Sequence, residues 1–261
     1  MSDAPLPIFD GHNDVLLRMA RGETEHQRSF LDRAEKGHLD LPRAREGGFA
    51  GGMFAMFVPS PRKNEEEPAR TAKGYDVPLP QPPELAEAQR ATLNMAASLL
   101  RTEAASQGAI KVVRNTAEMR GCFADGTLAA VMHIEGAEAI DPDLDMLEVL
   151  YQAGLRSIGI VWSRANHFGQ GVPFRYPSSP DIGPGLSEAG ERLVKACNRL
   201  GILIDVSHLN EKGFWDVVRI SDKPIVATHS NAHALCPVSR NLTDDQLRAI
   251  RDSNGMVGVN F

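Results

Sequence analysis

The sequence has few cysteines, no long apolar run and no excess of positive charge, and each shortage argues against a class of protein. The three cysteines are widely spaced and form no Cys-x-x-Cys pair, which indicates reduced thiols in a reducing compartment. No apolar run approaches the roughly 18 residues that a membrane-spanning helix needs. The net charge is −6 and no basic stripe is present, which argues against a nucleic-acid partner.

The N-terminal segment also lacks the pattern of a secretory signal peptide. The first residues, MSDAPLPIFDGHND, have no charged region followed by an apolar region, as a secretory signal peptide would. Together with the reduced cysteines and the missing membrane span, this predicts a cytoplasmic protein that has no membrane partner.

What the sequence does contain is a regular alternation of short apolar runs and helical patterns. The chain of 261 residues suits one large domain, and alternation of this kind predicts a parallel sheet with helical crossovers. Residues 59–83 are polar and proline-rich, which predicts a surface insertion loop. The apolar runs lie at 7–12, 52–58, 128–134, 156–162, 202–206, 224–227 and 256–261. The helical patterns lie at 84–105, 143–151, 188–201, 211–220 and after Thr243, with Ser187 and Thr243 as N-caps and Gln246 closing a capping box.

This rhythm favours a TIM-like (β/α)₈ barrel over residues 1–261. The seven apolar runs leave the eighth strand and the last helices of such a barrel unaccounted for, so we expect a C-terminally truncated product or part of a longer protein. An open, doubly wound sheet is the alternative. The barrel is preferred because polar residues recur at the C-terminal ends of several different strands, where a barrel builds its active site.

Five residues at these strand ends have the chemistry of metal ligands. His12 and Asp14 are two apart in an extended run, so their side chains project to the same side. Imidazole and carboxylate groups suit zinc or a similar cation. A single catalytic zinc needs only three protein ligands, so five predict two ions that share one carboxylate and hold a bridging hydroxide. The five residues are His12, Asp14, Glu135, His208 and His229.

Several motifs, taken in order, resemble the membrane (renal) dipeptidase family of zinc peptidases over nearly the whole chain. Each motif is modest alone, and the ordered set is specific. The motifs are Phe9-Asp10-Gly11-His12-Asn13-Asp14, Asp40-Leu41-Pro42-Arg43 with Gly47-Gly48, Glu135-Gly136, Asn198-Arg199-Leu200-Gly201, Ile204-Asp205-Val206-Ser207-His208, Thr228-His229-Ser230-Asn231-Ala232 and Arg240-Asn241-Leu242-Thr243-Asp244.

The resemblance implies a zinc dipeptidase with two ions per active site, which hydrolyses small dipeptides by a metal-bridging hydroxide. It implies that His12, Asp14 and Glu135 bind one zinc, and that Glu135, His208 and His229 bind the other. Glu135, as the shared ligand, is the expected catalytic residue. Arg240 matches the arginine that grips the substrate carboxylate, a contact for which a guanidinium is well shaped. Homodimers are common in that family, so a homodimer is an expected assembly.

The sequence departs from the family pattern at two places. The renal type has a histidine that approaches the developing oxyanion, and Trp162 stands at that position here. Trp162 is therefore a candidate pocket wall, and Asn166, His167 or Arg164 is a candidate replacement for the histidine. The aspartate that the family's eighth strand supplies for proton transfer has no counterpart among these residues.

Two other functions remain open at the level of sequence. The same barrel could hydrolyse another amide, such as an N-acyl amino acid or a cyclic amide, because a fold does not fix a function. The product could also bind metal without turnover.

His133, two residues before Glu135, is expected to point into the barrel, either as a buried core histidine or as a partner that supports the site.

Overall fold

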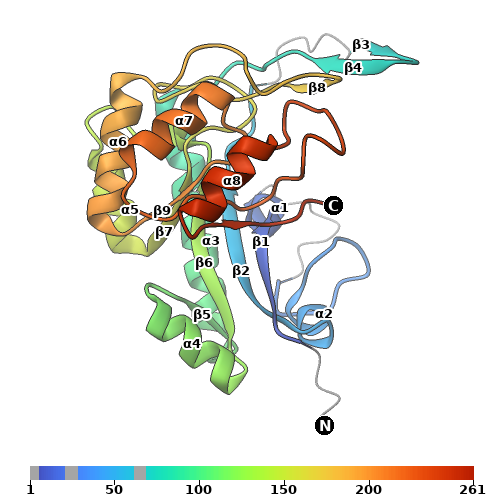
Figure 1. Cartoon of the computed structure of the whole chain (residues 1–261). Coiled ribbons are helices and arrows are strands. Elements are labelled where there is room, and N and C mark those ends of the chain that lie inside the picture. The colour runs from blue at the N-terminus through green and yellow to red at the C-terminus, as the bar shows by residue number, and fades with distance from the viewer. Residues whose placement is uncertain (1–5, 21–28, 62–68) are drawn as a thin grey trace.

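The computed structural model describes residues 6–20, 29–61 and 69–261 and contains one large parallel sheet. The eight-stranded sheet has the order β1-β2-β6-β7-β9-β10-β11, with β5 beside β6, and helices cover its outer side (Figure 1). All of its ladders are parallel. The strands are β1 (Ile8–Asn13), β2 (Phe49–Phe57), β5 (Ile110–Val112), β6 (Leu128–Glu135), β7 (Leu155–Gly159), β9 (Leu203–Asp205), β10 (Val226–Ala227) and β11 (Met256–Val257).

This strand order confirms the barrel-type prediction. Leaving β5 aside, each strand lies beside the next strand along the chain, as in a singly wound barrel, whereas a doubly wound sheet reverses direction at a switch point. All seven predicted apolar runs correspond to strands, and β6 is buried along its whole length. The sheet is therefore a curled part of a TIM-like barrel, and the carboxyl ends of its strands share one face.

The helices begin where the sequence supplies caps. Ser187, Asn210 and Thr243 each accept a hydrogen bond from the backbone N–H three residues later, and Thr243 forms the predicted capping box with Gln246. The sequence did not predict α1, α2, α4 or the 3₁₀ turn η1. The helices are α1 (Val15–Ala20), α2 (Leu41–Glu46), α3 (Leu85–Ala105), α4 (Thr116–Asp125), η1 (Ala137–Ala139), α5 (Asp145–Ala153), α6 (Glu188–Leu200), α7 (Glu211–Ile220) and α8 (Asp244–Asp252). No helix among these described segments is long and apolar enough to cross a membrane.

A second, small antiparallel sheet lies above the carboxyl ends of the barrel strands (Figure 1). It has the order β3-β4-β8, and β3 (Ala69–Thr71) and β4 (Gly74–Val77) fall within the predicted insertion at residues 59–83. That stretch therefore contains a β-hairpin as well as loop, while residues 62–68 lie outside the described residues. The hairpin pairs with β8 (Phe174–Tyr176), so the insertion is joined to the segment that follows β7.

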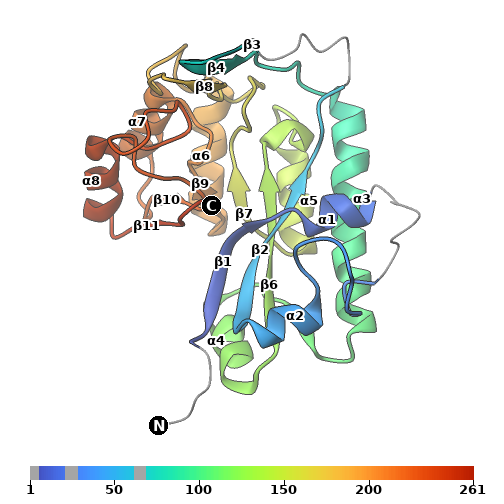
Figure 2. The same ribbon diagram turned by 90° about the vertical axis from the view of Figure 1, so that its right-hand side faces the viewer.

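The sheet curls far enough to bring β1 close to the end of β10. The ring centroids of His12 and His229 are 4.1 Å apart, and a Cβ on Gly11 would lie 2.1 Å from the carbonyl oxygen of Thr228. Only glycine fits at position 11. Figure 2 shows β1 beside the C-terminal segment that contains β11, and Gly258 in that segment approaches the same Thr228 oxygen.

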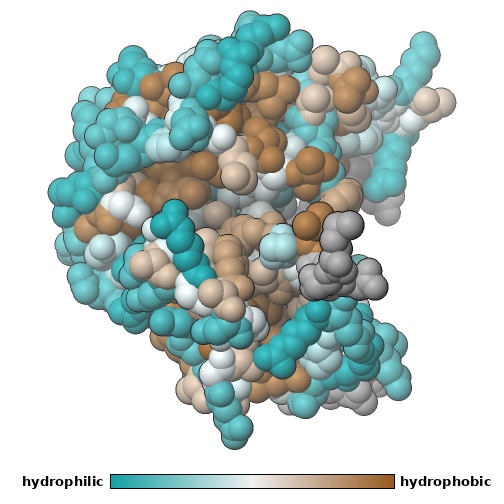
Figure 3. Space-filling model, turned by 60° about the horizontal axis from the view of Figure 1, so that its bottom comes forward, coloured by the Kyte–Doolittle hydropathy of each residue, from teal (hydrophilic) through white to brown (hydrophobic). Residues whose placement is uncertain are grey.

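Apolar side chains fill the space between the sheet and the outer helices. This core includes Phe54 and Met56 of β2, Met132 of β6, and Leu193 of α6, all of them buried. Apolar residues also reach the surface, and Figure 3 shows them gathered in the hollowed middle of one face. The packed core fixes the strands, and with them the side chains at the strand ends.

Candidate metal centre

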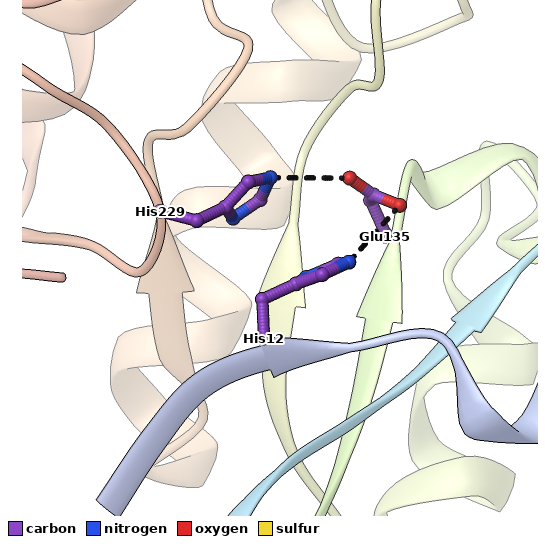
Figure 4. A group of neighbouring side chains, drawn as sticks. All are labelled: His12, Glu135 and His229. Carbon is purple, nitrogen blue, oxygen red and sulfur yellow. Dashed lines mark ion pairs between the residues drawn. The ribbon is translucent and has the colours of Figure 1, made fainter. Parts of the chain in front are cut away.

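The predicted ligands converge at the carboxyl ends of the strands. His12 lies in β1, Glu135 is the last residue of β6, and His229 follows β10 by two residues. Ligand atoms of these three side chains all lie within 4.8 Å of one another, and Figure 4 shows them pointing toward a common centre. The strand-end pattern in the sequence therefore corresponds to a real cluster in space.

Glu135 lies at the centre of the cluster and uses its two oxygens on different sides. Oε2 is 3.6 Å from His12 Nε2. Oε1 is 3.0 Å from His208 Nε2 and 3.4 Å from His229 Nε2. One carboxylate thus faces two separate groups of donors, which is the arrangement of a bridging ligand.

His208 and Asp14 complete the two groups. His208 is buried after β9 and lies 3.0 Å from His229, Nε2 to Nε2. Asp14 follows β1, and its Oδ1 is 3.6 Å from His12 Nε2. Its side chain is 49% exposed, so Asp14 forms the open rim of the cluster, whereas Glu135 and His208 form its buried floor.

The charges around Glu135 keep it ionised. Burial favours the neutral acid, but the positive potential of His12 and the contacts with His208 and His229 outweigh it and hold the pKa of Glu135 well below its ordinary value. Burial also lowers the pKa of His12, yet Glu135 and Asp14 raise it to about 9. The cluster is thus an anionic centre that is stabilised by positive charge.

The donor chemistry fits a metal ion. Imidazole nitrogen and carboxylate oxygen are the ligands that zinc takes. The Nδ1 atoms of His208 and His229 each lie 2.8 Å from a hydroxyl oxygen, of Ser163 and Thr228 respectively. In metal-binding histidines, the ring nitrogen that does not bind the ion typically forms such a hydrogen bond, because the bond orients the ring.

Arg240 brings a cation to the edge of this cluster. Its Nη2 donates a hydrogen bond to the carbonyl oxygen of His229 at 3.0 Å. Burial lowers the pKa of Arg240 to about 10, against the opposing effect of Glu135 and Asp205. The guanidinium therefore remains charged at neutral pH, and it is held by the loop that also carries His229.

Trp162 lies beside the cluster, as part of an aromatic wall. Its ring centroid is 5.9 Å from that of His208, 4.9 Å from that of Phe57 and 5.7 Å from that of Phe174. The sequence singled out Trp162 but not Phe57 or Phe174. Phe57 ends β2, so its place at a strand end was a usable signal. Phe174 comes from β8, which the sequence did not predict.

Asn166 and Arg164, which follow Trp162 in the chain, form their contacts outside the cluster. Asn166 folds its side chain onto its own loop: Nδ2 donates to the carbonyl of Ile160, and Oδ1 accepts from the backbone N–H of Phe168. Arg164 is fully buried and paired with Glu138, Nε to Oε1, at 2.7 Å. The described contacts therefore bring neither residue to the ligand cluster.

His133 is buried next to the centre. Its Nδ1 lies 2.9 Å from Ser157 Oγ, while its Nε2 has no hydrogen-bond partner among the described residues. Burial lowers the pKa of His133 to about 4, so its ring is neutral. As expected, it points inward, and its ring centroid is 5.9 Å from that of His12.

Comparisons with known proteins match nearly the whole chain to one family. The model of the membrane dipeptidase family, peptidase family M19, matches residues 3–261. A protein of Acinetobacter calcoaceticus, described as an uncharacterized protein in the PQQ-III 3′ region, is 43% identical over 100% of this chain and 82% of its own length.

Two solved structures share the fold closely. One is a metallo peptidase from Rhodobacter sphaeroides liganded with a phosphinate mimic of the dipeptide L-Ala-D-Ala; it is 54% identical, with a TM-score of 0.92 over 98% of this chain and 74% of that one. The other, a dipeptidase AC of family M19, is 55% identical, with a TM-score of 0.90 over 98% of this chain and 72% of that one.

Proposed function

Because this chain belongs to the membrane dipeptidase family of metallopeptidases, M19, we propose that it is a zinc dipeptidase with two ions in one active site. The observation that carries the proposal is the division of the Glu135 carboxylate, with Oε2 toward His12 and Oε1 toward His208 and His229. In this proposal His12, Asp14 and Glu135 hold one ion, and Glu135, His208 and His229 hold the other.

The zinc ions, when bound, would supply an activated water at neutral pH and polarise the scissile carbonyl. The protein's own residues orient the substrate. Arg240, a fixed cation at the edge of the cluster, is suited to bind the C-terminal carboxylate of a dipeptide. Trp162 and Phe57 form an apolar wall beside His208, which excludes water from that side and gives an apolar side chain a surface to pack on.

A dipeptide is favoured over amides that lack a free carboxylate because Arg240 lies beside His229, at the edge of the cluster. A cation next to the metal cluster suits a substrate whose free carboxylate lies one residue from the scissile bond. The related structure from Rhodobacter sphaeroides holds a mimic of L-Ala-D-Ala, so L-Ala-D-Ala is the first substrate to test. An N-acyl amino acid shares the carboxylate and is the competing substrate class. The homodimer, the cytoplasmic location and Asn166 as a substrate contact stay predictions.

The first test is the metal content and activity of the purified chain. We expect two zinc ions per chain by elemental analysis, loss of L-Ala-D-Ala hydrolysis on chelation, and recovery on adding zinc. Glu135→Gln should remove both ions, since each depends on that carboxylate. A chain that holds metal but cleaves neither dipeptides nor N-acyl amino acids would be a metal-binding protein without turnover.

The second test concerns Arg240. Arg240→Ala should lower kcat/KM for L-Ala-D-Ala by about 10- to 100-fold, because a hydrogen bond to a charged group contributes about 1.5–3 kcal/mol. It should have little effect on a dipeptide amide, which lacks the carboxylate. Arg248→Ala is the matched control, because Arg248 is an exposed arginine of α8. Equal losses on acid and amide would show that Arg240 does not bind the carboxylate.

A further inference from the structure

Asp205 is a buried carboxylate at the end of β9 that the proposed ligand set does not use. It is 1% exposed. Its Oδ1 accepts hydrogen bonds from the backbone N–H groups of Ser207 and Thr228, both at 2.9 Å. Its Oδ2 accepts one from the hydroxyl of Thr228 at 2.6 Å. A carboxylate so deeply buried and so fully bonded is held in one orientation.

The hydroxyl of Thr228 lies between Asp205 and His229. Thr228 Oγ1 is 2.8 Å from Nδ1 of His229. A hydroxyl has one proton to donate, and an ionised carboxylate can only accept. The Thr228 proton is therefore directed to Asp205, and its oxygen is left to accept a hydrogen bond from His229. It follows that Nδ1 of His229 carries the ring proton.

This assignment determines what the other nitrogen of His229 can do. With the proton on Nδ1, Nε2 presents a lone pair. That Nε2 lies 3.4 Å from Glu135 Oε1 and 3.0 Å from His208 Nε2, in the middle of the ligand cluster. His208 has a different support, because Ser163 Oγ, at 2.8 Å from its Nδ1, is a hydroxyl that can either donate or accept.

We propose that Asp205 and Thr228 are positioning residues that hold His229 in its Nδ1–H tautomer, so that Nε2 is ready to bind a metal ion. The tautomer itself is a property of the protein chain. Its significance for metal binding rests on the proposed role of His229 as a ligand.

Asp205→Asn gives the sharpest test, because it should reverse the chain of hydrogen bonds. Two backbone N–H groups face Oδ1, so the amide oxygen must take that place and the amide nitrogen must face Thr228. The amide then donates to Thr228, whose hydroxyl must donate to His229 Nδ1. The proton of His229 would move to Nε2, the atom that is needed for the metal.

Two measurements report separately on the tautomer of His229 and on the affinity for zinc. In the metal-free protein, ¹⁵N NMR of the histidine rings should show His229 as Nδ1–H in the wild type and as Nε2–H in Asp205→Asn. Competition with a chelator should show zinc affinity lower by about 10- to 100-fold in Asp205→Asn, as is usual when such a supporting partner is lost.

A second pair of variants covers the case in which Asp205→Asn does not fold. Thr228→Val removes the hydroxyl at nearly constant volume and should lower zinc affinity similarly, while Thr228→Ser should retain the wild-type affinity. Ser157→Ala is the matched control: it removes a buried hydroxyl that contacts His133, not a proposed ligand, and should leave zinc affinity unchanged.

Three outcomes would overturn the proposal: an Nε2–H tautomer of His229 in the metal-free wild type, wild-type zinc affinity in Thr228→Val, or equal losses in Thr228→Val and Thr228→Ser. The NMR result does not depend on catalysis. If the chain hydrolyses no dipeptide but shows the Nδ1–H tautomer, the proposed function fails while the positioning role of Asp205 and Thr228 stands.

Discussion

At the scale of single residues, the face that carries the metal centre contains a further buried charge, on Arg164. Its guanidinium donates to Glu138 Oε1 at 2.7 Å, to Ser60 Oγ at 2.8 Å and to the carbonyl of Val58 at 2.7 Å. These contacts join the loops that follow β2, β6 and β7. The sequence offered Arg164 as one of three candidates for the oxyanion contact, and in the structure it holds three loops together beneath the aromatic wall.

Arg164→Met should destabilise the protein by about 3–5 kcal/mol, because it leaves the Glu138 carboxylate buried without its partner. Urea unfolding would measure the change. The double variant Arg164→Met with Glu138→Leu should recover much of the loss, since it buries no charge. Arg199→Met, which breaks an exposed pair with Glu148, should cost less than about 1 kcal/mol. A loss for Arg164→Met as small as that would contradict this account.

At the scale of elements, short caps decide where the helices start, and the cap of α2 is a buried carboxylate. Asp40 is buried and its Oδ1 accepts from the backbone N–H of Arg43, while its Oδ2 accepts from the backbone of Ala34 and from Arg43 Nε. Burial raises the pKa of Asp40, but these hydrogen bonds outweigh it and lower the pKa below the ordinary 3.8. The anionic form of this cap is thus the form that stabilises the fold.

The pH dependence of stability should reveal this cap. Because the pKa is lower in the folded than in the unfolded chain, the stabilisation is complete above about pH 4 and is lost as the pH falls through the folded value. Asp40→Asn should therefore lower the free energy of unfolding at pH 7, and the difference from wild type should shrink below pH 4. Asp252→Asn, at an exposed site, is the control. A difference independent of pH would show that charge is unimportant at Asp40.

At the scale of the whole molecule, the curl of the sheet creates the metal centre. The residues His12 and His229 come from strands that are not neighbours in the sheet, yet their rings are 4.1 Å apart. The close approach of Gly11 to the Thr228 carbonyl permits this. Because the site joins distant parts of the sheet, a change in the curvature of the sheet should change its affinity for zinc.

Gly11→Ala tests the connection between curl and site. Its Cβ would lie 2.1 Å from the Thr228 oxygen, so β1 must move away, at a cost of about 1–3 kcal/mol. Zinc affinity should fall as well, because His12 moves with β1. Gly121→Ala is the control: no atom lies within 4 Å of its added Cβ, and in helix α4 it should stabilise by about 0.5–1 kcal/mol. Unchanged zinc affinity in Gly11→Ala would show that metal binding does not depend on the curvature of the sheet.

The sequence by itself determined the elements whose signals are local. Apolar runs located the seven strands that follow one another in the sheet, and side chains such as Ser187 and Thr243 located helix starts, because caps act over three residues. Polar residues at strand ends located the candidate ligands. The six-residue helices α1 and α2 escaped prediction, because so short a segment contains too little periodicity to distinguish it from a loop.

The tertiary structure decided everything that depends on pairs distant in the chain. The pairing of the β3–β4 hairpin with β8, the burial of Arg164 against Glu138 and the chain of hydrogen bonds from Asp205 to His229 each join segments that share no local pattern. The same is true of Glu135: its sequence position made it a candidate ligand, but only the curl of the sheet placed His12 at one of its oxygens and two histidines at the other. Such contacts depend on how the strands twist and pack, and no short stretch of sequence encodes that geometry.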